Sequence, residues 1–63
     1  MRDSAVRCDA GISLRNAARL LRVSDNTLRL YEIDPDAVRN AEKRERIAGF
    51  YAHLRAFLAA VAA

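Results

Sequence analysis

Residues that interrupt helices are few in this sequence, and their scarcity limits the folds that are open to it. In 63 residues the only strong breakers are Gly11, Pro35 and Gly49. No segment alternates apolar and polar residues between turn residues, as a half-buried strand would. Good helix formers, chiefly Ala, Leu and Arg, dominate instead. We therefore predict an all-α fold, a compact bundle of four or five helices in a single domain that spans residues 1–63.

Three short helices are predicted in the first half of the chain, over about residues 4–9, 14–21 and 25–33. Ser13 and Ser24 precede the second and third, and serine is favoured there because its hydroxyl accepts a hydrogen bond from a free backbone amide. The apolar residues of the second helix recur at spacings of three and four, on one face: Leu14, Ala17, Ala18 and Leu21. The other inward-facing residues are expected to be Ala5, Val6 and Cys8 in the first helix and Leu28 and Tyr31 in the third.

The second half of the chain leaves two arrangements open. Asp34 and Pro35 suit the start of a helix, which could run on to the C-terminus, or Asn40 could begin a separate last helix. A long, wide apolar stripe follows, and it could pack on its own domain, on a twin helix of a second copy, or on both. We take about residues 41–62 as the candidate dimerisation helix, with the interface residues Phe50, Leu54, Phe57, Leu58 and Val61.

The small size of the chain favours a partner. A domain of about 60 residues buries only about 60% of its unfolded surface and is marginal alone. Cys8 is the only cysteine, so no disulfide can form within the chain. Cys8 and His53 are the only soft ligands, too few for a structural zinc. We expect no metal, no cofactor and no small-molecule ligand, and we expect burial in an oligomer to supply the missing stability.

The longest apolar run is FLAAVAA, far short of the roughly 20 residues of a membrane-spanning helix. The first residues, MRDSAVRCDAG, are charged and lack the apolar core of a secretory signal. No paired carboxylates, nucleophile with a base, or phosphate-binding loop is visible. We therefore expect a soluble cytoplasmic protein that is not an enzyme and does not contact a membrane.

A polar cluster, Ser24-Asp25-Asn26-Thr27, stands between Val23 and Leu28, where neither a core helix nor a loop explains it. The charge is also uneven: residues 1–31 hold six arginines against three aspartates, whereas residues 32–63 carry five basic and five acidic side chains. Arginine offers a planar fork that suits phosphates and guanine edges. A solvated basic surface would explain the charge alone equally well.

Two short helices joined by about three residues, the second opening with polar side chains, are typical of a helix-turn-helix. The major groove of DNA, about 12 Å wide, admits one α-helix. In this motif the first helix braces against the DNA backbone, and the N-terminal residues of the second reach the base edges. Residues 25–33 are the recognition helix in this interpretation, because their first side chains are polar while Leu28 and Tyr31 remain as anchors.

The segment SLRNAARLLRVSDNTLRLYE resembles the helix-turn-helix of the Cro/lambda-repressor class of bacterial and phage regulators, often called XRE-like. The resemblance is close over about 20 residues and loose over the rest. It rests on Ser13, Ala18, Leu21, Val23, Ser24, Leu28 and the pair Tyr31-Glu32. It implies a lambda-repressor-like bundle that binds operator DNA as a homodimer in the cytoplasm of a bacterium or a phage-infected host.

The sequence departs from this family at two positions. The family usually has Gly in the turn where this chain has Arg22, so either Arg22 adopts a left-handed conformation, at a cost on the order of 1 kcal/mol, or the turn differs. Leu14 stands where many members place a polar residue that touches DNA. The run VSDNTLRLYE also resembles the MerR family, but IDPDAVRNAEKRER follows in place of that family's winged segment, so MerR ranks below the Cro class.

The helix-turn-helix interpretation gives two sets of candidate site residues, one for the bases and one for the phosphates of DNA. Those for base contact are Asn26, Thr27 and Arg29, since amide and guanidinium groups read adenine and guanine edges and a threonine methyl can touch thymine. Those for phosphate contact are Ser13, Arg15, Arg22 and Ser24. Ser24 and Thr27 have plain capping roles as well. Asp25 should be repelled by phosphates, and Leu30 could contact a thymine methyl or be covered by another helix.

We thus expect a sequence-specific regulator of transcription, a repressor in our prediction, that binds double-stranded DNA as a homodimer. Two recognition helices one turn of DNA apart, about 34 Å, would read two half-sites. The alternative is an interaction module, an adaptor or inhibitor subunit, that binds a protein through its C-terminal helices without DNA.

Overall fold

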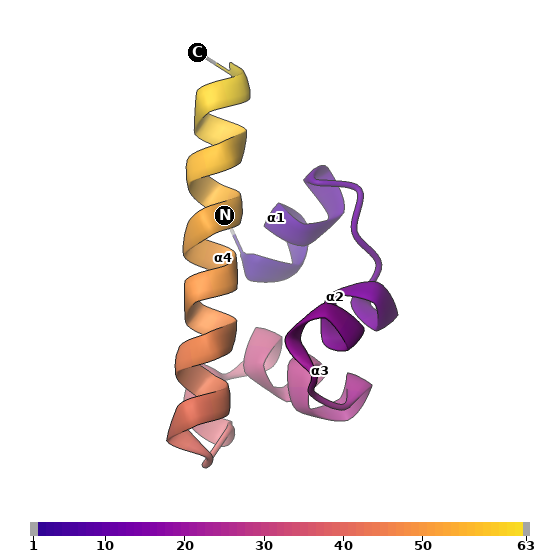
Figure 1. Cartoon of the computed structure of the whole chain (residues 1–63), viewed down its shortest axis with the longest axis vertical. Helices are drawn as coiled ribbons and strands as arrows, with labels where there is room; N and C mark the ends of the chain where they lie inside the picture. The colour runs from indigo at the N-terminus through magenta and orange to yellow at the C-terminus, as the bar shows by residue number, and fades with distance from the viewer. Residues whose placement is uncertain (1, 63) are drawn as a thin grey trace.

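Of the three breakers in the sequence, Gly11 and Pro35 lie outside the α-helices, whereas Gly49 lies inside the last one. The computed structural model describes residues 2–62. They form four α-helices and one short 3-10 helix: α1 (Asp3–Asp9), α2 (Leu14–Leu21), α3 (Asp25–Ile33), η1 (Pro35–Ala37) and α4 (Ala41–Ala62). No strand occurs in that range, so the prediction of an all-α fold is confirmed (Figure 1).

Polar side chains begin three of the helices as the sequence predicts. The Oγ atoms of Ser13 and Ser24 accept hydrogen bonds from the amides three residues further on, at 3.1 and 3.0 Å. The Oδ1 atom of Asn40 does the same at 3.0 Å. Asn40 therefore begins a separate last helix, which decides between the two arrangements that the sequence left open. The helix expected at Asp34 and Pro35 is only the single turn of η1.

The core lies where α1, α2 and α3 meet the first half of α4. Its central side chains, Val6, Leu28 and Ile47, are almost fully buried. The other members of the core are Ala17, Ala18, Leu21, Tyr31, Val38, Tyr51 and Leu54. The two buried alanines of α2 have small side chains, so the helices that they face can pack closely against α2. Val38, which no helical pattern marks in the sequence, enters the core from the extended segment after η1.

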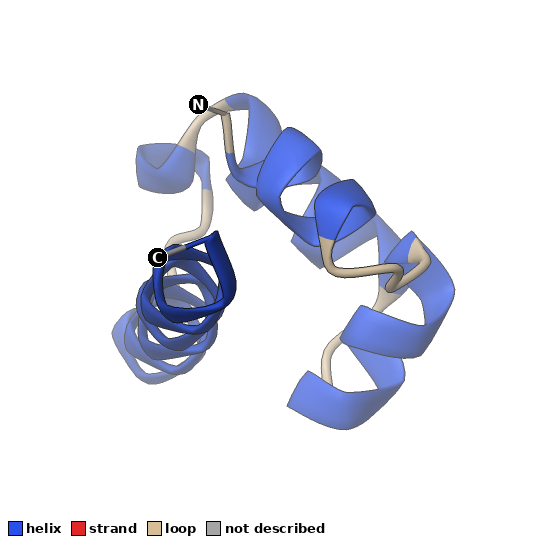
Figure 2. Cartoon of the chain, turned by 90° about the horizontal axis from the view of Figure 1, so that it is seen from above, coloured by secondary structure: helices blue, strands red, loops and turns tan. Residues whose placement is uncertain are grey.

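The helices α1 to α3 form an arc beside α4, which is clear when the molecule is seen from above (Figure 2). The radius of gyration is 11.2 Å, close to the value of about 10.6 Å that is typical of a compact domain of this length. The longest extent is 35 Å and follows α4. The bundle is therefore compact but has one long edge.

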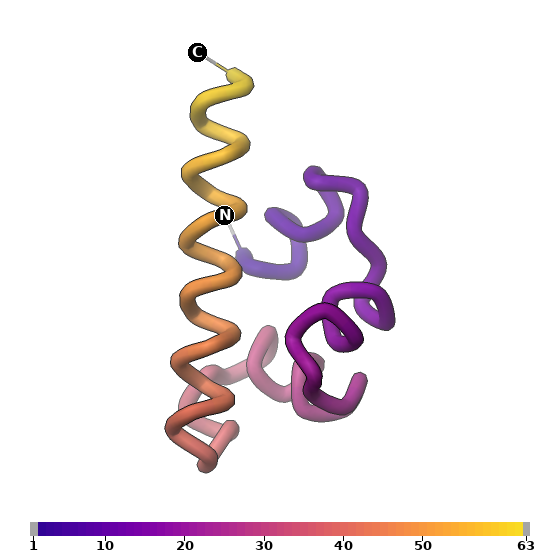
Figure 3. The backbone as a smooth tube through the Cα atoms, in the orientation of Figure 1, coloured from indigo at the N-terminus to yellow at the C-terminus, as the bar shows by residue number. Residues whose placement is uncertain are grey.

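The C-terminal end of α4 extends beyond the other helices (Figures 1 and 3). Its apolar stripe is continuous with the core, since Ile47, Tyr51 and Leu54 are buried. Further along, the stripe has less cover: Phe57 is 54% exposed and Val61 is 68% exposed. One helix thus supplies both a core face and an uncovered apolar end. Over residues 2–62, no helix combines the length and the apolar character that a membrane span requires.

One expectation about the core is wrong. Cys8 was expected to be a small buried residue of the first helix, but its side chain is exposed. Val6 is the buried residue of α1, and a position two residues later points about 200° around the helix axis, away from the same core.

Candidate functional site

The two faces of α3 differ in what surrounds them. Leu28 and Tyr31 are buried against the bundle, as the sequence predicts. Asn26, Arg29 and Leu30 lie on the exposed outer side, because residues three and four apart share a helix face. The side chains of Asn26 and Arg29 make no hydrogen bond or ion pair with another residue in the range 2–62. Two polar side chains are therefore presented side by side to whatever lies outside the protein.

The start of α3 adds two hydroxyl groups to this surface. Ser24 Oγ accepts from the Thr27 amide at 3.0 Å, and the hydroxyls of Ser24 and Thr27 lie 2.8 Å apart in a second hydrogen bond. Ser24 thus has the capping role that was predicted for it, whereas the Thr27 hydroxyl bonds to the Ser24 side chain and caps no backbone amide. Thr27 is half-buried and Ser24 is exposed, so the bonded pair stands next to Asn26 with a fixed geometry.

Asp25, the acidic residue at the start of α3, has a cationic neighbour. Arg15 Nε lies 3.7 Å from Asp25 Oδ2, and both side chains are largely exposed. An exposed pair at this distance contributes little stability, because solvent screens it. Its effect is local: Arg15, from the first turn of α2, lies beside the first turn of α3 and offsets a negative charge there.

The turn between α2 and α3 keeps its tight geometry without glycine. Arg22 adopts the left-handed conformation, with φ 59° and ψ 42°, the first of the two alternatives considered above. The Arg22 amide donates to Arg19 O at 3.2 Å, and the Val23 amide donates to Ala18 O at 3.0 Å. Arg46 of α4 also donates to Leu21 O at 2.8 Å. The end of α2 is thus well bonded, while the Arg22 side chain remains exposed.

An ion pair fixes α3 from its inner side. Arg7 of α1 donates from Nε to Glu32 Oε2 at 2.8 Å and from Nη2 to Glu32 Oε1 at 3.2 Å. The two side chains are only 11% and 9% exposed. Tyr51 of α4 donates its hydroxyl hydrogen to Glu32 Oε2. Its ring stacks on the ring of Tyr31, with 6.0 Å between the two ring centroids. Glu32 therefore joins three helices.

The ionisation of this cluster follows from its surroundings. Burial raises the pKa of Glu32, but the hydrogen bonds from Arg7 and Tyr51 outweigh burial, so the pKa lies below its usual value. The hydrogen bond to Glu32 raises the pKa of Arg7. Burial, with the neighbouring carboxylate, raises the pKa of Tyr51 well above its ordinary value. At neutral pH the cluster is a carboxylate held by one guanidinium and one phenol.

No pattern in the sequence predicts this cluster. Glu32 was noted only as the end of the family motif, and Arg7 only as part of the basic half of the chain. The two residues are 25 positions apart, and no periodicity connects side chains at that separation. A search for charges on the inner faces of predicted helices would have marked both.

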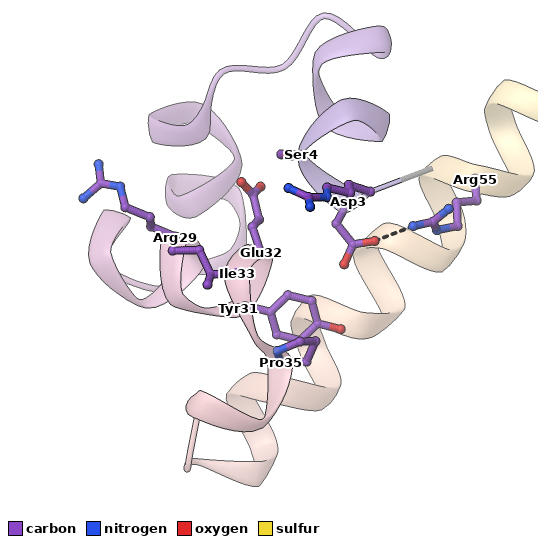
Figure 4. Close-up of a pocket in the computed structure, with 9 residues that line it drawn as sticks. Asp3, Ser4, Arg29, Tyr31, Glu32, Ile33, Pro35 and Arg55 are labelled. Atoms are coloured by element: carbon purple, nitrogen blue, oxygen red, sulfur yellow. Dashed lines mark hydrogen bonds and ion pairs between the residues drawn. The ribbon is translucent and has the colours of Figure 1, made fainter.

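A hollow of about 550 Å³ lies between the start of α1, the end of α3 and α4 (Figure 4). Its carboxylates already have partners: Asp3 pairs with Arg55 at 2.5 Å, and Glu32 pairs with Arg7. Arg29 lines the rim, and in Figure 4 its guanidinium points away from the other labelled residues. The guanidinium of Arg29 is therefore available for contacts on the outer side of α3 and is not taken up by the hollow.

The predicted dimer residues fall into two groups. Leu54 is buried in the core of its own chain, and Phe50 and Leu58 are half-buried against that core. Phe57 and Val61 are largely exposed. Two of the five are therefore more than half exposed, both at the free end of α4. Figure 1 shows this end far from α2 and α3, at the opposite end of the long axis.

The predicted DNA-contacting residues belong to one continuous part of the fold. Ser13, Arg15, Arg22, Ser24, Asn26, Thr27 and Arg29 all belong to α2, α3, their caps or the turn between them. Comparison of the chain with known proteins finds no family model, no curated protein and no solved structure that matches it.

Proposed function

We propose that this chain is a sequence-specific DNA-binding regulator in which α2, the turn and α3 form a helix-turn-helix of the Cro/lambda-repressor kind. The observation that carries the proposal is the outer face of α3, where Asn26 and Arg29 are exposed and have no partner within residues 2–62. Asn pairs with adenine and Arg with guanine through two hydrogen bonds each, and in the major groove these contacts specify sequence.

The rigidity of α3 supports this proposal. A reading helix must hold its side chains in a fixed register against the base edges, and loose support costs recognition. Glu32, on the inner side of α3, is bonded to α1 and α4 at once. The helix is therefore anchored from behind while its outer face stays free.

The residues around α3 suit the DNA backbone. Arg15 and Arg22 are exposed and stand at the start and the end of α2. Ser13 and Ser24 are exposed caps, where backbone amides and hydroxyls can meet phosphate oxygens. In this proposal these four residues set the position of the protein, and Asn26, Thr27 and Arg29 read the bases.

The free end of α4 supports a homodimer. Phe57 and Val61 continue a core stripe and are 54% and 68% exposed, and the neighbouring small residues Ala56 and Ala60 would let a second helix approach closely. A pseudo-palindromic operator requires two recognition helices about 34 Å apart, so a dimer joined at this end would have to hold its two α3 helices at that spacing. In this proposal the protein acts as a repressor, by occupying DNA that other proteins need.

Selection of duplexes from a random DNA pool at near-physiological salt tests the proposal. We expect a motif with two half-sites about one helical turn, roughly 34 Å, apart. The purified protein should have the mass of two chains at micromolar concentration. Phe57→Ser should lower that mass to one chain, whereas His53→Ser, an exposed control on the same helix, should leave it unchanged. If no motif is recovered, the DNA-binding proposal is wrong.

A second candidate function has its own observation. The exposed end of α4 could take a helix of another protein, in which case the chain would be an adaptor or inhibitor subunit. Two variants distinguish the proposals. Neutralising Arg15, Arg22 and Arg29 together should abolish binding to the duplex but leave binding to a protein partner unchanged. Phe57→Ser should abolish binding to the protein partner.

A further inference from the structure

The outer face of α3 carries a large apolar side chain among its polar ones. Leu30 is 41% exposed, so residues 2–62 cover it only in part, and contact with a thymine methyl remains open to it. It lies four residues after Asn26 and therefore shares a helix face with it, whereas Arg29 precedes it by one residue and points about 100° around the helix axis from it. An exposed leucine is ordinary by itself, but this one sits within the surface that we propose for reading bases.

The chemistry of the major groove offers a specific match for such a side chain. Of the four bases in unmodified DNA only thymine presents a methyl group there, at C5, and apolar side chains are its natural contact. The methyl of 5-methylcytosine occupies the same position on the other pyrimidine. Against either methyl group, the Leu30 side chain would bury apolar surface and leave no hydrogen-bonding group unpaired. Next to an unmethylated pyrimidine, the space of the missing methyl would stay unfilled.

We infer that Leu30 reads the C5-methyl group of a pyrimidine, so that each half-site contains a thymine or 5-methylcytosine next to the base read by Asn26 or Arg29. This inference rests on the proposed DNA-binding function. Ile33 is more exposed, but it lies at the C-terminal end of α3 and lines the hollow beside Pro35. Base contacts come chiefly from the first turns of a recognition helix, which favours Leu30.

The test uses the duplex recovered by selection and replaces its thymines with uracil one at a time, in both half-sites. Uracil keeps every hydrogen-bonding group and loses only the methyl. One position should weaken binding by about fourfold per half-site, the factor that corresponds to one buried methyl group. At that position a 5-methylcytosine–guanine pair should bind more tightly than a cytosine–guanine pair by a similar factor.

Two variants show whether Leu30 is responsible. Leu30→Ala, which keeps a good helix former at an exposed position, should bind the thymine and uracil duplexes equally. Leu20→Ala, an exposed leucine of α2, should keep the full difference. Circular dichroism should show the same helix content in both variants and in the unmodified protein.

The outcomes separate the inference from the proposed function. If binding changes neither when uracil replaces a thymine nor when 5-methylcytosine replaces a cytosine, at any position of the recovered motif, the inference is overturned and the DNA-binding proposal stands. A uracil effect that persists unchanged in Leu30→Ala overturns it as well. If no duplex is recovered at all, both fail together.

Discussion

The two faces of α3 make opposite uses of their side chains. On the inner face Leu28 and Tyr31 are buried and Glu32 is bonded to two other helices. On the outer face Asn26 and Arg29 have no partner within residues 2–62. The inner face therefore contributes to folding, and the outer face contributes little to it. Substitutions on the two faces should accordingly separate stability from binding, and the predictions below test that separation.

The largest effect is expected on the inner face. Glu32→Gln removes the charge that balances Arg7, and an unbalanced charge that is mostly buried costs about 3 kcal/mol in the free energy of unfolding. The matched control is Glu42→Gln. Glu42 pairs with Arg46 at 3.1 Å, but its side chain is 83% exposed, so we expect a loss of only about 0.5 kcal/mol or less. Urea denaturation measures both. Similar losses in the two variants would contradict the role given to the Glu32 cluster.

The same cluster should make the protein sensitive to acid. The pKa of Glu32 is lower in the folded protein than its usual value, so the unfolded chain takes up the proton first as the pH falls. The stability that Glu32 contributes is fully present above about pH 4.3, the ordinary pKa of the residue, and is lost as the pH falls through the folded-state pKa. The difference in unfolding free energy between the unmodified protein and Glu32→Gln should therefore narrow in acid. A difference that stays constant from pH 7 to strong acid would show that the carboxylate is not stabilised by its partners.

On the outer face the effect should be on binding alone. Arg29→Gln should weaken the selected duplex by about tenfold or more, since a bidentate arginine–guanine contact contributes about 1–3 kcal/mol of discrimination. Its free energy of unfolding should change by no more than about 0.5 kcal/mol, as for other surface substitutions. Arg39→Gln, an exposed arginine outside α2 and α3, is the control and should change neither quantity. A large loss of stability in Arg29→Gln would break the comparison.

The smallest effect is expected at Arg22 in the turn, where a substitution should raise the stability of the fold and weaken DNA binding. Arg22→Gly relieves the left-handed conformation of Arg22, so the protein should gain on the order of 0.5 kcal/mol after the extra freedom of glycine in the unfolded chain is deducted. If Arg22 contacts a phosphate, the slope of log affinity against log salt should fall by about 0.9.

Arg22→Ala separates the two contributions, because it keeps the backbone strain and removes the guanidinium. It should lower the salt slope by the same amount without the gain in stability. A salt slope that is unchanged in both variants would show that Arg22 does not contact the DNA backbone.

The sequence predicts the parts of this molecule that depend on near neighbours. Ser13 and Ser24 cap their helices as expected, because each cap involves only the following turn. The cap at Asn40 was one of two arrangements that the sequence left open. The left-handed Arg22 was one of two alternatives, and the geometry of the turn decides it. The inward and outward sides of α3 also follow from spacing alone.

The parts that depend on distant contacts escaped prediction. Arg7 and Glu32 meet only because α1 and α3 are brought together by the core, and no local pattern connects them. Leu54 fits a dimer stripe by its spacing, yet within the chain it packs in the core, because α1 to α3 cover the first part of α4 but not its end. Cys8 was misplaced for a related reason, since only one side of the short α1 meets the bundle.

An NMR titration of the ¹⁵N-labelled protein with the selected duplex shows which face of the molecule meets DNA. We expect the largest changes in amide shift at the turn and the first part of α3, residues 22–30, with smaller changes at residues 13–15. Residues near the free end of α4, 57–62, should not change with added duplex. Shifts confined to that end, or no shifts at all, would contradict the claim that the outer face of α3 reads DNA.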